Sequence, residues 1–205
     1  MQRVEIEDLV ASREETFRLR ELLNKGGVAA LPTETFYALA TDPLSEVGVR
    51  RICEMKGRDA VKALPVLFAT REHLNWLGID AAPGVLEPYF QIWPAPLTVV
   101  FSIRHPIAAS RGIRKLGVRM PADRMLRILL QSLGPVTGTS VNRSGSPPLD
   151  DPDAVEALFR RHIDWLVDGG RTPGGKASTV VDATTAPPAV LRPGAYDWPR
   201  IGARL

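Results

Sequence analysis

The segment VAALPTETFYAL, residues 28–39, runs from an apolar stretch straight into a cluster of polar side chains. Residues 28–31 have the composition of a short, fully buried strand, and the proline after them ends it. The Thr-Glu-Thr of residues 33–35 then stands where the chain leaves the sheet, which is where open α/β sheets bind ligands. Two hydroxyls and a carboxylate there could bind a small polar substrate. The pattern also fits a turn whose hydroxyls cap the backbone, and composition alone favours that turn.

Helix and strand signals alternate along the rest of the chain. A capping box of Ser12 with Glu15 predicts a helix that Gly26 and Gly27 end. Apolar stripes predict further helices over residues 47–55, 124–133 and 153–162. Short apolar or β-branched runs predict strands at residues 64–69, 97–103, 116–120, 135–140, 165–167, 179–181 and 189–191.

This alternation predicts an α/β fold, built on a twisted, mixed sheet with flanking helices. The chain has no internal repeat and no segment with the composition of an interdomain linker. We therefore expect a single domain over residues 1–205, with its motifs in about residues 15–195. Residues 196–205 are weakly patterned and are expected to form a loose tail.

Composition excludes several classes of protein. Cys53 is the only cysteine, so neither an intrachain disulfide nor a cysteine-rich metal site is possible, and the three histidines form no ligand motif. No apolar run has the length of a membrane span and the N-terminus resembles no signal peptide, which together predict a cytoplasmic protein without a membrane partner. The formal net charge of +3 permits an anionic ligand or RNA but requires neither.

A first group of cations follows the helix predicted over residues 47–55. Lys56, Arg58 and Lys62 crowd between two buried elements, where they repel one another unless an anion joins them. A polyphosphate is one such anion, because Arg grips phosphate oxygens in pairs. The simpler alternative is that these cations are solvated or complement the helix dipole.

Two further segments carry polar groups after predicted strands. Residues 137–145, TGTSVNRSG, are rich in hydroxyls and small side chains that let backbone N–H groups approach an anion, although an ordinary turn has the same composition. Ser178 and Arg192 each lie at one end of a short predicted strand, where the alternative is a plain hairpin with a surface arginine. The Walker A loop, the dinucleotide fingerprint GxGxxG and the nucleophile elbow GxSxG are all missing from the sequence.

Each of these segments is weak alone, but their order along the chain is specific. The ordered motifs are PTETFYAL (32–39), KGR (56–58), WPAPLT (93–98), VRMP (118–121), SVNRSG (140–145), STVVD (178–182) and RPG (192–194). Together they resemble the YrdC-like family of threonylcarbamoyl-adenylate synthases in its short, single-domain form. The resemblance implies a twisted α/β sheet with a basic concave site. It also implies a nucleotidyltransferase that joins L-threonine, bicarbonate or CO2 and ATP into threonylcarbamoyl-AMP and pyrophosphate, which a tRNA-modifying transferase system then uses.

The resemblance carries residue roles over position by position. It implies threonine binding by Thr35, Arg119 and Ser178. It implies ATP binding by Lys56, Arg58, Lys62, Lys115, Ser140, Asn142 and Arg192, with Lys56 and Arg58 as the catalytic cations. Mg2+ is expected to arrive with ATP rather than in a dedicated carboxylate site.

Some positions depart from the family pattern and affect the expected threonine contacts. The departures are Ala38, Ala40, Ala95 and Val141, which carry extra methyl groups, and Leu67, where some members place a histidine. Extra methyls could narrow the site or shift the backbone. One alternative is therefore a non-catalytic nucleotide- or RNA-binding relative of the YciO type. Another, ranked last, is a carbamoyl-transfer module like that of hydrogenase-maturation proteins, whose additional parts this chain has no room for.

Overall fold

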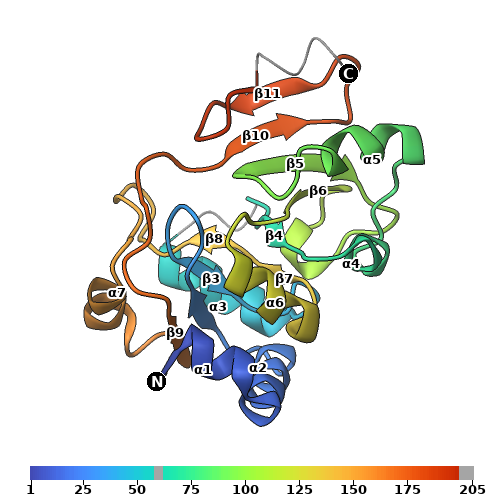
Figure 1. Cartoon of the computed structure of the whole chain (residues 1–205). Helices are drawn as coiled ribbons and strands as arrows, with labels where there is room; N and C mark the ends of the chain where they lie inside the picture. Colours follow the sequence, from blue (N-terminus) through green and yellow to red (C-terminus); the bar gives the residue numbers. More distant parts are fainter. Residues whose placement is uncertain (58–61, 199–205) are drawn as a thin grey trace.

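The computed structural model describes residues 1–57 and 62–198, and its strands form two sheets (Figure 1). The five-stranded sheet has the order β1 (Gln2–Glu5), β9 (Trp165–Asp168), β2 (Ala29–Leu31), β3 (Ala38–Ala40), β8 (Thr139–Ser140). The six-stranded sheet has the order β11 (Ala189–Arg192), β10 (Thr179–Asp182), β5 (Leu97–Ser102), β6 (Lys115–Arg119), β4 (Val66–Leu67), β7 (Val136–Thr137). The helices are α1 (Ile6–Ala11), α2 (Arg13–Asn24), α3 (Glu46–Lys56), α4 (Arg71–Trp76), α5 (Pro83–Phe90), α6 (Arg124–Leu133) and α7 (Pro152–Phe159), with a 3-10 turn at Ala108–Ser110.

Both sheets are mixed, as the sequence predicts. In the first, β2 runs parallel to β9 and antiparallel to β3, while in the second, β5 runs parallel to β10 and antiparallel to β6. The α/β class is therefore confirmed, but the strands divide between two sheets where we expected one.

The division into two sheets occurs inside the predicted strand 135–140. The chain pairs with β4 as β7, and after Gly138 it pairs with β3 as β8. A Cβ atom at Gly138 would lie 2.4 Å from the side chain of Leu67 on β4, which is too close for any other residue. Glycine therefore lets the chain pass this close to β4. One continuous apolar stretch thus serves two sheets because a residue without a side chain separates its halves.

Local capping explains the helix boundaries that the sequence predicts correctly. The Ser12 hydroxyl accepts a hydrogen bond from the Glu15 amide at 3.2 Å and begins α2. At the C-terminal end of α3, Gly57 adopts the left-handed conformation, with φ of 56°. This conformation favours glycine and ends the helix. Sequence reasoning missed β1, α1, β3, α4 and α5, which are short and in part lack the clear periodicity of longer elements.

Two hydrophobic clusters hold the described residues together. One packs α1, α2 and α6 on the five-stranded sheet, with four leucines of α6 buried. The other lies between the sheets and includes an aromatic group around Trp93, whose indole N–H donates to the Leu97 carbonyl at 2.8 Å. Trp198 stacks on Tyr89 at 6.0 Å between ring centroids, so residues 196–198 pack against the core instead of forming the expected loose tail. Residues 199–205 of that tail lie outside the described residues.

The departures from the family pattern are also part of these clusters. Ala38, Ala40 and Leu67 are buried in the cluster beneath α6, and Ala95 and Val141 in the cluster between the sheets. Their side chains therefore fill the hydrophobic core, so their extra methyl groups are accommodated by core packing.

Candidate active site

The first group of predicted residues gathers around Thr35 and Arg119. Thr35 lies in the loop that leaves β2, and Arg119 ends β6 in the other sheet. The Arg119 guanidinium donates to the Thr35 hydroxyl at 3.4 Å and forms an ion pair with Glu34, with Nη2 and Oε1 2.5 Å apart. Thr35 and Arg119 are both buried, with 5% and 6% of their surface exposed. The two sheets therefore meet at this buried, charged contact.

Internal hydrogen bonds hold the loop that carries Thr35. The Thr33 hydroxyl donates to the Phe36 carbonyl at 2.7 Å and accepts from the Thr35 amide at 3.1 Å. The Thr35 carbonyl accepts from the Gly174 amide and from the Thr172 hydroxyl. The expected capping turn is thus present, and the same turn aims Glu34 and Thr35 at Arg119.

Ser178, which directly precedes β10, and Arg192, which ends the neighbouring β11, form the second group. The Arg192 guanidinium donates to the Ser178 carbonyl at 2.7 Å and to its hydroxyl at 3.2 Å. The Ser178 hydroxyl also lies 3.0 Å from the Thr98 hydroxyl. Thr98 precedes Val99, which pairs with Val118 in the antiparallel ladder, so Thr98 stands beside Arg119. The β5–β6 pairing therefore joins this group to the first.

The charges of the two groups act on each other. Arg192 is exposed as a residue, but its guanidinium head lies against Ser178. Burial of this head and the nearby positive charge of Arg119 lower the pKa of Arg192 below its ordinary value. A guanidinium whose charge is destabilised in this way favours an anion beside it.

Lys56, Ser140 and Asn142 form the third group. The Lys56 ammonium donates to the Ser140 carbonyl, to the Asn142 carbonyl at 3.1 Å and to the Asn142 side-chain oxygen at 2.7 Å. The Ser140 hydroxyl donates to the same side-chain oxygen at 2.7 Å. Lys56 is 4% exposed, so it fixes the course of residues 140–142 from inside the protein. The sequence-based alternative of a solvated lysine is wrong for this residue.

The structure places other predicted residues apart from these groups. Lys62 is exposed. Lys115 begins β6, at the opposite end of the strand from Arg119, and pairs with Asp182 at 3.0 Å. Arg58 lies outside the described residues. Two sets of predicted residues thus come together. One set is Thr35, Arg119, Ser178 and Arg192, and the other is Lys56, Ser140 and Asn142. Lys115 belongs to neither set.

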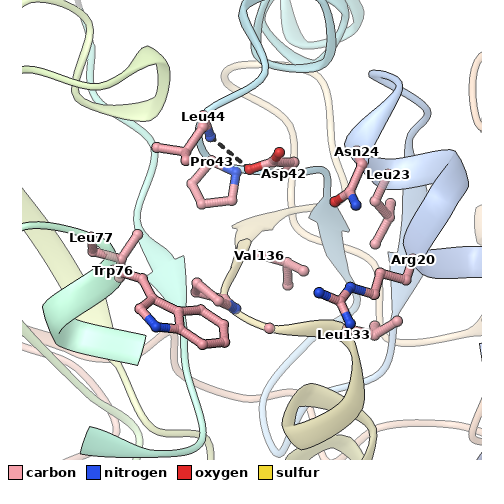
Figure 2. A pocket seen from close by; sticks show the side chains of 12 residues that line it. Arg20, Leu23, Asn24, Asp42, Pro43, Leu44, Trp76, Leu77, Leu133 and Val136 are labelled. Atoms are coloured by element: carbon pink, nitrogen blue, oxygen red, sulfur yellow. Dashed lines mark hydrogen bonds between the residues drawn. The ribbon is translucent and has the colours of Figure 1, made fainter. Parts of the chain in front are cut away.

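The expected basic hollow is not apparent among the described residues. One cavity of about 330 Å³ borders the Lys56 group and is lined by Gly57, Arg143, Ser144 and His162 among others. A second, of about 140 Å³, lies between α2, α4 and α6, where Figure 2 shows Arg20, Asp42 and Trp76 in its wall. Neither of these two cavities is lined by Arg119 or Ser178.

Sequence reasoning placed Thr33 and Glu34 only in a polar cluster, without individual roles, and it gave no role to Thr98; all three touch the predicted residues. Glu34 stands between the two threonines of the PTET motif, and Thr98 ends the WPAPLT motif, so both were inside recognised segments. The period-2 alternation of strand β5 could have placed Thr98 on the same sheet face as its partners. The Glu34–Arg119 pair had no comparable signal, because it joins two different sheets.

No group of three or more His, Cys, Asp or Glu side chains in residues 1–57 and 62–198 could hold a metal ion. Helices long and apolar enough to cross a membrane are likewise missing from these residues.

Comparison with known proteins identifies the family. The sequence model Sua5_yciO_yrdC, described as "Telomere recombination", matches residues 21–194, and the chain belongs to this family. A threonylcarbamoyl-AMP synthase of Pyrococcus abyssi is 35% identical over 191 residues, which are 90% of this chain and 56% of that protein.

Solved structures agree with this assignment. A crystal structure of Pyrococcus abyssi Sua5 complexed with L-threonine superposes with a TM-score of 0.85 at 32% identity, covering 98% of this chain and 59% of that one. Escherichia coli YciO gives a TM-score of 0.81 at 23% identity, covering 93% and 94%, and shows a shared fold. The chain thus spans little more than half the length of the Pyrococcus proteins.

Proposed function

We propose that this chain is an L-threonylcarbamoyl-adenylate synthase. The observation that carries the proposal is the meeting of three parts of the chain through direct contacts and strand pairing: the loop with Thr35, the end of β6 with Arg119, and the β10–β11 hairpin with Ser178 and Arg192. The relative from Pyrococcus abyssi named threonylcarbamoyl-AMP synthase supports it. So does the related structure that contains L-threonine.

The proposed reaction joins L-threonine, bicarbonate or CO2, and ATP. The neutral amine of threonine first adds to the carbon of CO2 and loses a proton to water, which gives a carbamate. A carbamate oxygen then attacks the α-phosphorus of ATP, the bond from that phosphorus to the bridging oxygen breaks, and pyrophosphate leaves. This makes the enzyme a nucleotidyltransferase. No protein nucleophile takes part, so the residues act by binding and by stabilising charge.

The described side chains divide between the two substrates. Arg119 offers a guanidinium to the threonine carboxylate, and Thr35 and Ser178 offer hydroxyls beside it. Arg192 is a second cation whose pKa the charge of Arg119 helps to lower, and a phosphate beside it would relieve that repulsion. Threonine and the nucleotide are therefore held side by side, with their reacting groups at the junction of the two sheets.

Lys56, Ser140 and Asn142 are proposed to serve the nucleotide phosphates. The three hydrogen bonds of Lys56 fix the loop of residues 140–142, and the charge of its ammonium adds to the local positive potential. We retain Arg58 and Lys62 as proposed phosphate ligands on the resemblance alone. Lys115 is the weakest of the proposed ATP ligands, because it is paired with Asp182 at the far end of its strand.

We propose that Mg2+ accompanies ATP. Because the described residues supply no cluster of metal ligands, the phosphates and water would complete its coordination. When bound, the ion would neutralise the charge of the leaving pyrophosphate.

The wider setting is also part of the proposal. The product would pass to a transferase system that modifies tRNA in the cytoplasm, and the net charge of +3 is compatible with an RNA contact. The alternative of a non-catalytic YciO-type protein is not favoured, because the likeness to YciO at 23% identity concerns the fold alone.

A pyrophosphate-release assay tests the proposal. With ATP, bicarbonate and Mg2+ present, pyrophosphate should appear only when L-threonine is added. A matched reaction with L-valine, which replaces the hydroxyl by a methyl group, should be much slower. Pyrophosphate release that ignores threonine, or no release at all, would overturn the proposed function.

A further inference from the structure

Glu34 has a buried carboxylate that the proposed reaction does not yet use. It lies at the centre of the PTET loop, between Thr33 and Thr35, and faces Arg119 across the junction of the two sheets. Its side chain is 15% exposed and that of Arg119 is 7% exposed. A carboxylate and a guanidinium in such a place have given up most of their hydration.

The pair is close but poorly satisfied. Although Arg119 Nη2 and Glu34 Oε1 approach to 2.5 Å, the geometry of this contact is not that of a hydrogen bond. Within the described part of the chain, neither oxygen of Glu34 nor the Nε of Arg119 has a hydrogen-bond partner, and all three atoms are buried. Buried charged groups normally have such partners, so this arrangement indicates that another molecule supplies them.

An α-amino acid has the charges that match this pair. Its carboxylate and ammonium are attached to the same carbon and carry opposite charges. The facing groups of Arg119 and Glu34 also carry opposite charges. In the free protein, Arg119 and Glu34 neutralise each other. A zwitterion that inserts between them replaces one badly oriented ion pair by two, and each can have good hydrogen-bond geometry.

We propose that Glu34 is a specificity-determining residue that binds the α-ammonium group of the amino-acid substrate, while Arg119 binds its carboxylate. This inference rests on the proposed function and names the group that recognises the amine. It explains why an acidic side chain occupies a region otherwise rich in cations. It also means that the site rejects hydroxy acids, because these would leave the Glu34 charge buried without a partner.

The competing explanation is that Glu34 only holds Arg119 in position. The two explanations differ for a ligand without an amine. If Glu34 binds the ammonium, removing the amine from the ligand weakens binding to the wild-type protein but hardly changes binding to a variant without the Glu34 carboxylate. If Glu34 merely positions Arg119, its loss weakens all carboxylate ligands alike, with or without an amine.

The test is an equilibrium titration of the full chain with L-threonine and with 3-hydroxybutyrate of matching configuration, which lacks only the amine. The wild-type protein should bind 3-hydroxybutyrate about 10- to 100-fold more weakly than threonine, the range for a charged hydrogen bond. In Glu34→Gln this ratio should fall to about 3-fold or less, because threonine binds more weakly and 3-hydroxybutyrate does not. Glu34→Asp keeps the charge and should retain an intermediate ratio.

The wild-type titration alone can overturn the inference if the variants fail to fold. Equal affinity for the two ligands would show that nothing recognises the amine. An unchanged ratio in folded Glu34→Gln would assign Glu34 to a positioning role and overturn the inference as well. Absence of any threonine binding by the wild-type protein would instead overturn the proposed function, so the two failures are distinguishable.

Discussion

Ala38 on β3 pairs with Ser140 on β8, and this ladder contact brings together two motifs that are about half the chain apart in sequence. The same junction is extended by the Val141 amide, which donates to the Tyr37 carbonyl at 2.9 Å. The PTET loop and the SVN loop are therefore neighbours by backbone pairing, not by side-chain contacts that a substitution could remove. This makes the relative position of the two proposed substrate groups a property of the sheet.

Replacement of Arg119 should affect threonine more than ATP. In Arg119→Lys, which keeps the charge but not the planar donors, the KM for threonine should rise about 10- to 100-fold while the KM for ATP changes about 3-fold or less. Steady-state pyrophosphate release at varied concentrations of each substrate measures both. Arg114→Lys, an exposed position near the other end of the strand, is the matched control. Equal effects on the two substrates would contradict the division of roles.

Arg192 should couple pyrophosphate binding to thermal stability. Saturation with pyrophosphate at about 100 times its Kd stabilises a protein by about 2.7 kcal/mol, which raises the Tm of a chain of this size by about 5–10 °C. The rise should be at most half as large in Arg192→Ala, because the phosphates would lose one of their proposed cationic ligands. Arg160→Ala, on the exposed end of α7, should behave like the wild type. A full Tm rise in Arg192→Ala would remove Arg192 from the phosphate site.

Lys56 should stabilise the protein even without ligands. Lys56→Met keeps the length of the side chain but removes the donor to the Ser140 and Asn142 carbonyls and one of the two donors to the Asn142 side-chain oxygen, so the free energy of unfolding should fall by about 1–3 kcal/mol. Urea denaturation measures the change. Lys25→Met, at an exposed site at the end of α2, should change it by about 0.5 kcal/mol or less. An unaltered unfolding free energy in Lys56→Met would mean that these hydrogen bonds contribute nothing to the free protein.

His73 should make stability fall in mild acid. Burial lowers its pKa in the folded protein below the ordinary value of 6.5, and its Nδ1 accepts a hydrogen bond from the Ala69 amide. Below pH 6.5 the unfolded chain takes up a proton that the folded protein resists. The stability contributed by neutral His73 is therefore present above pH 6.5 and is lost as the pH falls toward the folded pKa.

His73→Gln should flatten this dependence, because glutamine can accept the same hydrogen bond without titrating. The slope attributable to His73 is at most about 1.4 kcal/mol per pH unit. Unfolding free energies measured between pH 7.5 and 5 for both proteins test it. His105→Gln, at an exposed histidine, is the control. Identical slopes in the wild type and His73→Gln would contradict the assignment.

Much of the fold follows from local patterns in the sequence. Ser12 and Gly57 mark helix ends because capping depends on a few neighbouring residues. The split of residues 135–140 between two sheets depends on what Gly138 meets across the fold, namely Leu67, and no local pattern contains that contact. Short elements such as β3 and α4 were missed for a related reason, because three to six residues give too little periodicity to recognise.

The candidate site divides in the same way. The motif order predicts which residues matter, and Thr35, Arg119, Ser178 and Arg192 do come together. The sequence could not show that Lys56 donates hydrogen bonds to backbone carbonyls, or that Asp182 pairs with Lys115. These partners come from distant strands, and an ion pair across a sheet leaves no trace in either segment alone.

The central claim is that the residues around Arg119 bind threonine for its activation by ATP. The most direct measurement is the release of pyrophosphate from ATP, with bicarbonate and Mg2+, in the presence and absence of L-threonine, by the wild type and by Arg119→Lys at low threonine concentration. The account predicts release that requires threonine and that is strongly reduced in the variant. Release without threonine, or equal rates in the two proteins at low threonine, would contradict it.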